Sequence, residues 1–510
     1  MKKARMTVRR IIVLLVLSVF AAYPLFAQIA PPEDLQASLQ KIRSYIEPSM
    51  KAWGTPGLAV GIVKDGRVIL AQGFGRRDVE KDLPVTSKTR FILGSTTKAF
   101  TTMAMGILVD EGKLDWDRPV SSYLPQFRLM NEYAALHATP RDLVTHRTGL
   151  PRHDFIWSNT AFSLPEVFES LQFLEPSRDL RTAYQYNNLM YIAAGYLVGR
   201  VADSSWEEVV RERIFKPLGM ADSGCTVPEL LASPEFSFAY ERKKGELAAR
   251  PFPTPDDVLM YGPRASGSVN TTAEDMCKWM LLHLNKGMAG GQRVISAANL
   301  LQMHTPQVTI PWRPNEKSEF MHPSYGLGWS VDSYRGRYRV HHGGATMGFF
   351  SYVSLFPHEN LGIVVLANMG GAVPAIIANY ASDVLLGLEP LDWNKKVRDM
   401  MKAEDATASP EKRVEGTKPS HKLEDYAGEY SHPAYGRLKV EAAQDALTAS
   451  WNRITSLLEH WHYETFRTAG DGLRSMKLTF QANARGEIIS VSAPLEPAVK
   501  EIVFQRVQKR

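Results

Sequence analysis

The chain carries the segment Phe91-Ile-Leu-Gly-Ser-Thr-Thr-Lys98, in which Ser95 and Lys98 form an S-x-x-K pattern. The pattern follows a short apolar run and opens an apolar helical stretch that ends at Gly112. Helical spacing places the Lys98 amine one turn beyond the Ser95 hydroxyl, on the same face. The positive end of the helix dipole and its free N–H groups favour an oxyanion. The segment therefore predicts a serine nucleophile beside a basic amine.

This chemistry needs both groups, because a serine hydroxyl is a weak nucleophile until a base accepts its proton. A lysine can be that base when burial near a positive helix end disfavours its charged form. Two further S-x-x-K matches begin at Ser38 and Ser409, both in polar stretches. An N-cap serine followed by a surface lysine would have the same spacing, so context has to separate these alternatives.

Strand patterns occur on both sides of a helical middle region, residues 120–300. Residues 58–63 and 68–72 are apolar around a Lys-Asp-Gly-Arg turn, which predicts a hairpin. We therefore expect an α+β fold, in which helices flank an antiparallel sheet built from both chain ends, with an all-helical subdomain. The later expected elements are strands at 325–331, 337–341, 349–356 and 361–367 and a helix at 375–388.

The composition changes after residue 390. Residues 391–422 are polar and charged, and we expect a charged helix followed by a linker. Short strand patterns divided by turns then predict a small antiparallel β barrel or sandwich over residues 423–510. The expected domains are residues 1–27, 31–390, 391–422 and 423–510.

The first 27 residues have the order of a secretory signal peptide. Basic residues lead into an apolar run at residues 11–22, and small residues follow, with Ala27 before Gln28 and then Ala30. We expect cleavage after Ala27, and a secreted or periplasmic protein without a stable membrane span. An uncleaved membrane anchor is the alternative, because Leu25 fits poorly at the third position before the cleavage site, where a small residue is usual.

Composition and charge exclude several classes of protein. Hydrophobic residues make up 44% of the chain and charged residues 22%, a balance unlike that of a disordered chain. The net charge of +6 falls to +1 without the first 27 residues, because 55 basic residues then face 54 acidic ones. No basic excess is left to neutralise phosphates, so a nucleic acid is not an expected partner.

The chain offers little for a metal site. Cys225 and Cys277 cannot form a CxxC zinc site, and we interpret them as separate core thiols, with a single disulfide as the alternative. His460 and His462 flank a tryptophan in the C-terminal region and are interpreted as surface residues. No metal and no organic cofactor is expected, because the nucleophile, the base and the oxyanion donors are all protein groups.

Two further motifs supply groups that this chemistry uses. Tyr186-Asn-Asn188 is the single Y-x-N sequence of the chain and lies where a loop passes into a helix. A tyrosine can relay a proton, and an asparagine can bind an amide or orient the lysine; a helix cap beside a buried tyrosine is the structural alternative. His342-Gly-Gly344 follows a strand, and its glycines let a substrate backbone lie close. A glycine-rich turn is the alternative there.

In this order, the motifs resemble the serine β-lactamase and penicillin-binding peptidase superfamily, in its class C-type branch with related esterases and D-amino-acid peptidases. The resemblance runs from about residue 31 to residue 388. The C-terminal segment Tyr426-Ala-Gly-Glu-Tyr430 resembles the lipocalin-like barrel that follows some of these hydrolases. Further marks of the superfamily are residues 142–151, 267–275 and 325–329.

The resemblance implies a role for each motif residue. The serine would attack a carbonyl and become acylated, while the lysine and the tyrosine would share the role of base. The residues so implied are Ser95, Lys98 and Tyr186 for catalysis, Asn188, His342 and Gly344 for substrate binding, and the N–H groups of Ser95 and Ala345 for the oxyanion hole.

His342 departs from the family pattern, because many relatives have the lysine of a K-T-G strand at this position. A histidine with a reference pKa of about 6.5 is only partly charged at neutral pH. Gly343 also removes the threonine hydroxyl. Both changes weaken the grip on a substrate carboxylate, which penicillins and peptidoglycan stem peptides carry. We therefore expect slow β-lactam hydrolysis at most.

The sequence thus predicts a secreted serine hydrolase that forms an acyl-enzyme and cleaves a D-amino-acid-containing peptide or a carboxylic ester. Its partner would be a small-molecule or peptide substrate, including one derived from the cell wall. The alternative is a penicillin-binding or sensing protein that does not hydrolyse its ligand. The C-terminal unit could cap the active site, bind a substrate tail or form an oligomer interface.

Overall fold

The computed structural model describes residues 33–158, 162–252, 264–312, 318–405, 412–443, 445–452, 454–469 and 475–508. Residues from Ile42 onward form one compact unit. The described residues before it, 33–41, belong to a separate unit and form the first turns of helix α2 (Glu33–Trp53). The signal peptide expected at residues 1–27 lies outside the described residues. In the described part of the chain, no helix is both long and apolar enough to span a membrane.

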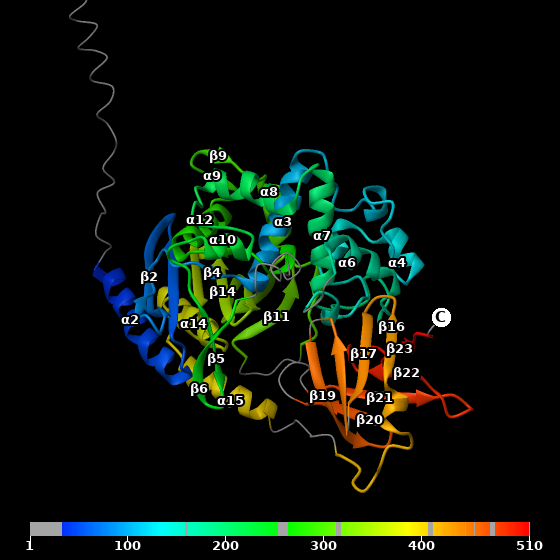
Figure 1. Ribbon diagram of the computed structural model, residues 1–510. Helices are drawn as coiled ribbons and strands as arrows, with labels where there is room; N and C mark the ends of the chain where they lie inside the picture. Colours follow the sequence, from blue (N-terminus) through cyan, green and yellow to red (C-terminus); the bar gives the residue numbers. More distant parts are fainter. Residues whose placement is uncertain are drawn as a thin grey trace, which may run out of the picture. The chain divides into compact units, whose positions relative to one another are not determined.

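A nine-stranded antiparallel sheet forms the centre of the larger domain, in the order β10-β11-β12-β13-β14-β15-β1-β2-β3. Strands β1 (Gly57–Lys64) and β15 (Leu361–Ala367) are adjacent and almost entirely buried, so their sequences are continuous apolar runs. Figure 1 shows blue strands from the start of the chain beside yellow-green strands from much later. The expected sheet built from both chain ends is confirmed. Its other strands are β2 (Arg67–Asp78), β3 (Leu83–Pro84), β10 (Val308–Thr309), β11 (Phe320–Tyr325), β12 (Ser330–Tyr334), β13 (Arg337–Thr346) and β14 (Phe349–Phe356).

The sequence predicted the turn between β1 and β2 but not the turn between β11 and β12. The β1–β2 hairpin forms as expected, with Asp65 and Gly66 at positive φ values of 49° and 76°, as in a two-residue hairpin turn. The strand expected at residues 325–331 is wrong as a single element, because β11 ends at Tyr325, residues 326–329 connect the two strands, and β12 begins at Ser330. Gly328 has a φ of 79°, and Gly326 lies so close to Met303 O that no Cβ fits.

The regular structure described between the two halves of the sheet is mostly helical, as expected. Helix α12 (Ala273–Leu284) packs against β1, β2 and β15, and α14 (Val373–Leu385) packs against β14 and β15. Asn187 caps α7 by accepting the Met190 N–H. The helices of this region also include α3 (Lys98–Asp110), α4 (Glu132–His137), α5 (Pro140–Val144), α6 (Leu164–Ser170), α7 (Asn188–Val201), α8 (Trp206–Val210), α9 (Lys216–Leu218), α10 (Val227–Leu231) and α13 (Ala297–His304).

The C-terminal strands close into an eight-stranded antiparallel barrel, as the sequence predicted. Burial alternates along its strands, so every second side chain points into the core. Helices α15 (Trp393–Asp405) and α16 (Leu423–Tyr426) precede it. The prediction did not include the short strands β20, β21 and β23. The strands are β16 (Gly428–His432), β17 (Gly436–Ala443), β18 (Ala446–Trp451), β19 (Ile454–His462), β20 (Thr465–Thr468), β21 (Lys477–Ala482), β22 (Ile488–Ala493) and β23 (Ile502–Arg506).

Cys225 and Cys277 are both free and buried, in agreement with two separate core thiols. Burial raises the pKa of both thiols, that of Cys277 to about 12, so neither is a reactive thiolate at neutral pH. Among the side chains that the structure describes, no group of three or more His, Cys, Asp or Glu residues is arranged to hold a metal ion.

Candidate active site

Ser95 lies in a tight passage from strand to helix. Gly94 turns the chain with a φ of 58°, and a 3₁₀ turn, η1 (Gly94–Thr97), leads directly into α3. The carbonyl of Leu93 accepts a hydrogen bond of 2.6 Å from Ser351 Oγ on β14. This bond ties the turn to the sheet and holds Ser95 in the wall of a cleft.

Lys98 is fully buried at the start of α3, with its amine against Ser95. Its Nζ lies 3.1 Å from Ser95 Oγ, 2.7 Å from Asn188 Oδ1 and 3.0 Å from the carbonyl oxygen of Ser266. Burial lowers the pKa of Lys98 well below its usual value, and the Arg152 charge adds to the shift. A neutral amine has two hydrogens and one lone pair. The amide and carbonyl oxygens can only accept, so in the neutral form they take the two hydrogens and leave the lone pair for Ser95.

Tyr186 stands beside the same amine, because Lys98 Nζ is 4.7 Å from its ring centroid. Burial raises the pKa of Tyr186, and a hydrogen bond with Ser95 opposes the rise. The phenol therefore keeps its proton at neutral pH, while burial favours the neutral form of the lysine amine. Of these two groups, Lys98 can act as the base and Tyr186 can pass a proton on.

Asn188 begins α7 and joins Lys98 to a loop of the helical region. Its Nδ2 donates to Asp154 Oδ1 at 3.1 Å, and its second amide hydrogen can donate to a substrate carbonyl. Asp154 also accepts from Arg152 Nε at 2.6 Å and Trp157 Nε1 at 2.8 Å. Sequence reasoning missed Arg152 and Asp154. The available signal was an oppositely charged pair directly after the Thr-Gly-Leu-Pro segment of the family motif.

His342 is buried on β13, and the residues that line the cleft do not include it. Its Nδ1 donates to the Gly343 carbonyl at 2.6 Å, because a carbonyl can only accept, and its Nε2 accepts from the Tyr325 hydroxyl at 2.9 Å. Burial lowers the pKa of His342 to about 3, so the ring is neutral rather than partly charged. The structure thus places His342 against Tyr325, whereas Gly343 and Gly344 line the cleft.

The N–H groups of Ser95 and Ala345 lie on two segments in close contact. A Cβ at Gly94 would be 2.5 Å from Ala345 N. A Cβ at Gly344 would overlap Leu93 O and lie 3.0 Å from Ser95 N. Only glycine fits at these two positions, and the close approach brings both N–H-bearing residues to one end of the cleft.

The cleft has a volume of about 1070 Å³ and takes part of its wall, residues 495–498, from the C-terminal barrel. Its charged side chains are Arg152, Asp154 and Glu496. A second cavity of about 460 Å³ shares Ala345 and Phe350 with the cleft. The hairpin of β5 (Ala239–Lys243) and β6 (Glu246–Arg250) lines that second cavity.

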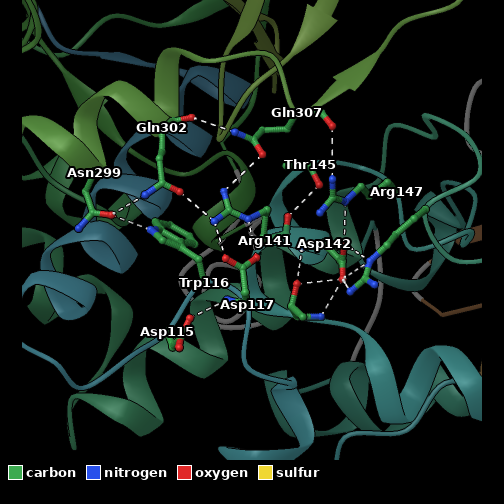
Figure 2. Close-up of polar contacts among 12 residues, drawn as sticks. Asp115, Trp116, Asp117, Arg141, Asp142, Thr145, Arg147, Asn299, Gln302 and Gln307 are labelled. Atoms are coloured by element: carbon green, nitrogen blue, oxygen red, sulfur yellow. Dashed lines mark hydrogen bonds and ion pairs between the residues drawn. The ribbon is translucent and has the colours of Figure 1, made fainter.

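A polar network holds the family segment that begins at Asp142 (Figure 2). Asp142 accepts from Arg147 Nε at 2.6 Å, and Arg147 also donates to the Gln307 carbonyl at 3.3 Å. Although burial alone would raise the pKa of Asp142, hydrogen bonds from arginine side chains and the backbone hold it below its usual value. His146 lies in the same segment, and its buried ring lies 4.3 Å from that of Tyr186. The segment thus packs against the ring of Tyr186.

This fold, with a serine, a buried lysine and a tyrosine at one end of a cleft, defines a serine hydrolase of β-lactamase architecture. The chain belongs to the β-lactamase family, whose family model matches residues 42–385. Residues 412–506 match a domain of unknown function, DUF3471.

Two fungal relatives are similar over most of the chain. The unguisins hydrolase ungD′ of Aspergillus campestris is 29% identical, over 79% of this chain and 77% of its own length. The unguisins hydrolase ungD of Aspergillus violaceofuscus is also 29% identical, over 82% and 80%. Among solved structures, the octameric penicillin-binding protein homologue from Pyrococcus abyssi has a TM-score of 0.60 at 24% identity, covering 92% of this chain and 100% of that chain. That likeness supports the fold.

Proposed function

We propose that the protein forms an acyl-enzyme on Ser95 and so cleaves an amide or ester bond. The observation that carries the proposal is the fully buried amine of Lys98, which lies 3.1 Å from Ser95 Oγ and whose pKa burial lowers well below its usual value. Lys98 is assigned as the base, and Tyr186 as the group that relays the proton to the leaving atom.

The reaction has two halves. In the first, the Ser95 oxygen bonds to the substrate carbonyl carbon while its proton passes to Lys98, and the N–H groups of Ser95 and Ala345 hold the oxyanion. The proton then passes through Tyr186 to the leaving amine or alkoxide, and the bond to the leaving group breaks. In the second, a water gives its proton to the base and attacks the ester carbon. The Ser95 oxygen leaves with that proton, which releases the acid.

The cleft supports a substrate whose carboxylate is not tightly held. His342 is neutral and bonded to Tyr325, Gly343 offers no hydroxyl, and the Arg152 guanidinium is paired with Asp154. The substrate class is therefore a D-amino-acid-containing peptide or a carboxylic ester, with weak or no β-lactamase activity. A cleft of about 1070 Å³ has room for a peptide. The fungal relatives, named as hydrolases of unguisins, favour the same choice.

Export and assembly belong to the same proposal. The signal-like order of the first 27 residues supports secretion or a periplasmic location, with Gln28 as the mature N-terminus. N-terminal sequencing of the exported protein tests this, and a retained Met1 would contradict it. The solved relative named as octameric favours an oligomer, and we propose that the barrel forms its interface. A monomeric mass by light scattering would contradict that part.

The test is intact mass after mixing the purified protein with a fluorophosphonate probe, with Ser95→Ala as the control. We expect one adduct on the wild type and none on the variant. Turnover of a penicillin, a p-nitrophenyl ester and a D-alanyl peptide then identifies the bond cleaved. A lasting penicillin adduct without turnover of any of them would favour a penicillin-binding or sensing protein. No probe adduct on the wild type would contradict the assignment of Ser95.

A further inference from the structure

Two side chains of the C-terminal barrel bond to His153, a buried residue of the larger domain. Glu496 Oε2 accepts the His153 backbone N–H at 2.8 Å, and the Tyr435 hydroxyl lies 2.7 Å from His153 Nδ1. His153 Nε2 lies 3.0 Å from the Glu175 carbonyl, which can only accept. Nε2 therefore carries the hydrogen, and Nδ1 accepts from Tyr435. Burial lowers the pKa of His153, which keeps the ring in this neutral form.

His153 needs such contacts because its backbone lies in the left-handed region, with φ 44° and ψ 41°. A residue with a side chain adopts this conformation stably only where its surroundings hold it. The contacts to its backbone N–H and to Nδ1 both come from the barrel. The barrel therefore sets the direction of the chain on either side of His153.

That direction matters because both neighbours of His153, Arg152 and Asp154, line the cleft. Asp154 Oδ1 accepts from Asn188 Nδ2 at 3.1 Å. A carboxylate can only accept, so the Asn188 amide is held with its nitrogen toward Asp154 and its oxygen toward Lys98. A shift of Asp154 would release the amide and, with it, one of the two acceptors that orient the lysine.

Further contacts fix how the barrel packs against the loop around His153. The ring of Trp451 in the barrel lies 5.4 Å from that of Phe155, and Trp451 Nε1 donates to the Tyr435 carbonyl at 2.8 Å. The Ala498 N–H donates to Glu496 Oε1 at 3.0 Å, which leaves Oε2 for the loop. Each oxygen of Glu496 thus has its own donor, and the side chain has one orientation.

We propose that Glu496 and Tyr435 are positioning residues of the active site. They hold His153, so that Asp154 orients Asn188 and Asn188 orients the Lys98 amine. The inference rests on the proposed function, since it concerns how the proposed base is held. It predicts that catalysis depends on barrel residues that do not touch the reacting atoms.

The first test variant is Tyr435→Phe, which removes one hydroxyl. Tyr435 is not among the residues that line the cleft, so substrate binding should be unchanged. For p-nitrophenyl ester hydrolysis we expect kcat to fall roughly tenfold, with the KM unchanged, because a small misplacement of a catalytic group slows the chemical step. Fluorophosphonate labelling should slow in proportion. Glu496→Gln keeps the size of the side chain and should show the same fall in kcat.

The matched control is Tyr430→Phe, which deletes a barrel hydroxyl that donates to the Tyr426 carbonyl at 2.8 Å. Tyr430 is buried as Tyr435 is, but its hydroxyl has no described bond to the His153 loop. Its loss should therefore leave kcat at the wild-type value. Thermal denaturation of all three variants checks that the barrel is folded.

A double-mutant cycle separates positioning from a general loss of stability. Asp154→Ala breaks the link between the loop and Asn188, so adding Tyr435→Phe to it should lower kcat little further. If the wild type is labelled at Ser95, three results would overturn the inference. They are fully additive effects of Asp154→Ala and Tyr435→Phe on kcat, a change confined to KM, and a kcat in both barrel variants equal to that of Tyr430→Phe. A wild type that is not labelled at Ser95 would instead overturn the proposed function, and the inference with it.

Discussion

The Nζ atom of Lys98 lies 2.7 Å from Oδ1 of Asn188, a residue 90 positions further along the chain. Lys98 begins α3 and Asn188 begins α7, so the packing of two helix starts positions the amine. The amide oxygen can only accept, so it takes one hydrogen of the neutral amine and helps to leave the lone pair for Ser95. The S-x-x-K spacing brings the Lys98 amine near Ser95, and the contact with Asn188 orients this amine so that it can act as a base.

Removing the amine tests this assignment most directly. Lys98→Met keeps an unbranched side chain in the buried site but has no basic group. We expect kcat/KM for a p-nitrophenyl ester to fall by about 10²–10⁴-fold, the usual contribution of a general base. Lys113→Met, at an exposed lysine paired with Glu111, is the matched control and should keep the wild-type rate. Near-wild-type activity in Lys98→Met would remove Lys98 from the role of base.

The pH dependence of acylation should report the same group. Lys98 accepts a proton only when it is neutral, so the rate should rise with pH through its pKa, which burial holds well below the usual value. The Arg152 charge lowers this pKa further, so Arg152→Gln should raise it and move the acid limb to higher pH. The measurement is the rate of fluorophosphonate labelling against pH. Arg437→Gln on the barrel surface should leave the profile unchanged, and an unmoved limb in Arg152→Gln contradicts the assignment.

Two neighbouring glycines provide a matched pair for the oxyanion end of the cleft. A Cβ at Gly344 would overlap Leu93 O and lie 2.5 Å from Ser351 Oγ, whereas a Cβ at Gly343 has its nearest neighbour at 3.6 Å. Gly344→Ala should lower the free energy of unfolding by about 1–3 kcal/mol, as overpacking does, and slow labelling of Ser95. Gly343→Ala should keep wild-type stability. Equal denaturation curves for the two variants would mean that the close approach is not required.

The neutral His342 and the bare Gly343 explain why we expect weak penicillin turnover. Gly343→Thr combined with His342→Lys should raise this turnover about tenfold or more, because hydrogen bonds to a charged carboxylate contribute roughly 1.5–3 kcal/mol. The control replaces the threonine by valine in the same background, since valine has its shape but no hydroxyl. Steady-state rates with benzylpenicillin compare the two. No advantage for threonine over valine would make the carboxylate argument wrong.

A buried histidine pair predicts acid sensitivity away from the cleft. His283 Nδ1 lies 3.0 Å from His304 Nε2, and burial lowers the pKa of His304 to about 4. The unfolded chain has the ordinary value of about 6.5, so it binds the proton more readily. Stability from this group is therefore present above about pH 6.5 and lost as the pH falls to about 4, an effect of about 3 kcal/mol. Urea unfolding over this range should be less pH-dependent in His304→Gln; an equal slope contradicts the prediction.

The features that the sequence predicted well depend on residues close together in the chain. The spacing of Ser95 and Lys98 follows from one helical turn, and the first hairpin follows from Asp65-Gly66 between apolar runs. The segment at residues 325–331 shows the limit of such patterns. Its apolar residues suggest a strand, but Gly326 and Gly328 form a turn that packs closely against Met303 of α13 and against Lys98 of α3.

The sequence by itself determined the α+β architecture, the β-rich C-terminal domain and the motif residues, because hydrophobic period and local spacing are properties of short segments. Only the tertiary structure decided that His342 is neutral and bonded to Tyr325, and that Asp154 and Glu496 stand at the cleft. The physical reason is that a pKa and a hydrogen-bond partner depend on burial and on groups brought together from distant positions. Glu496 and His153, 343 positions apart, meet only when the barrel packs against the larger domain.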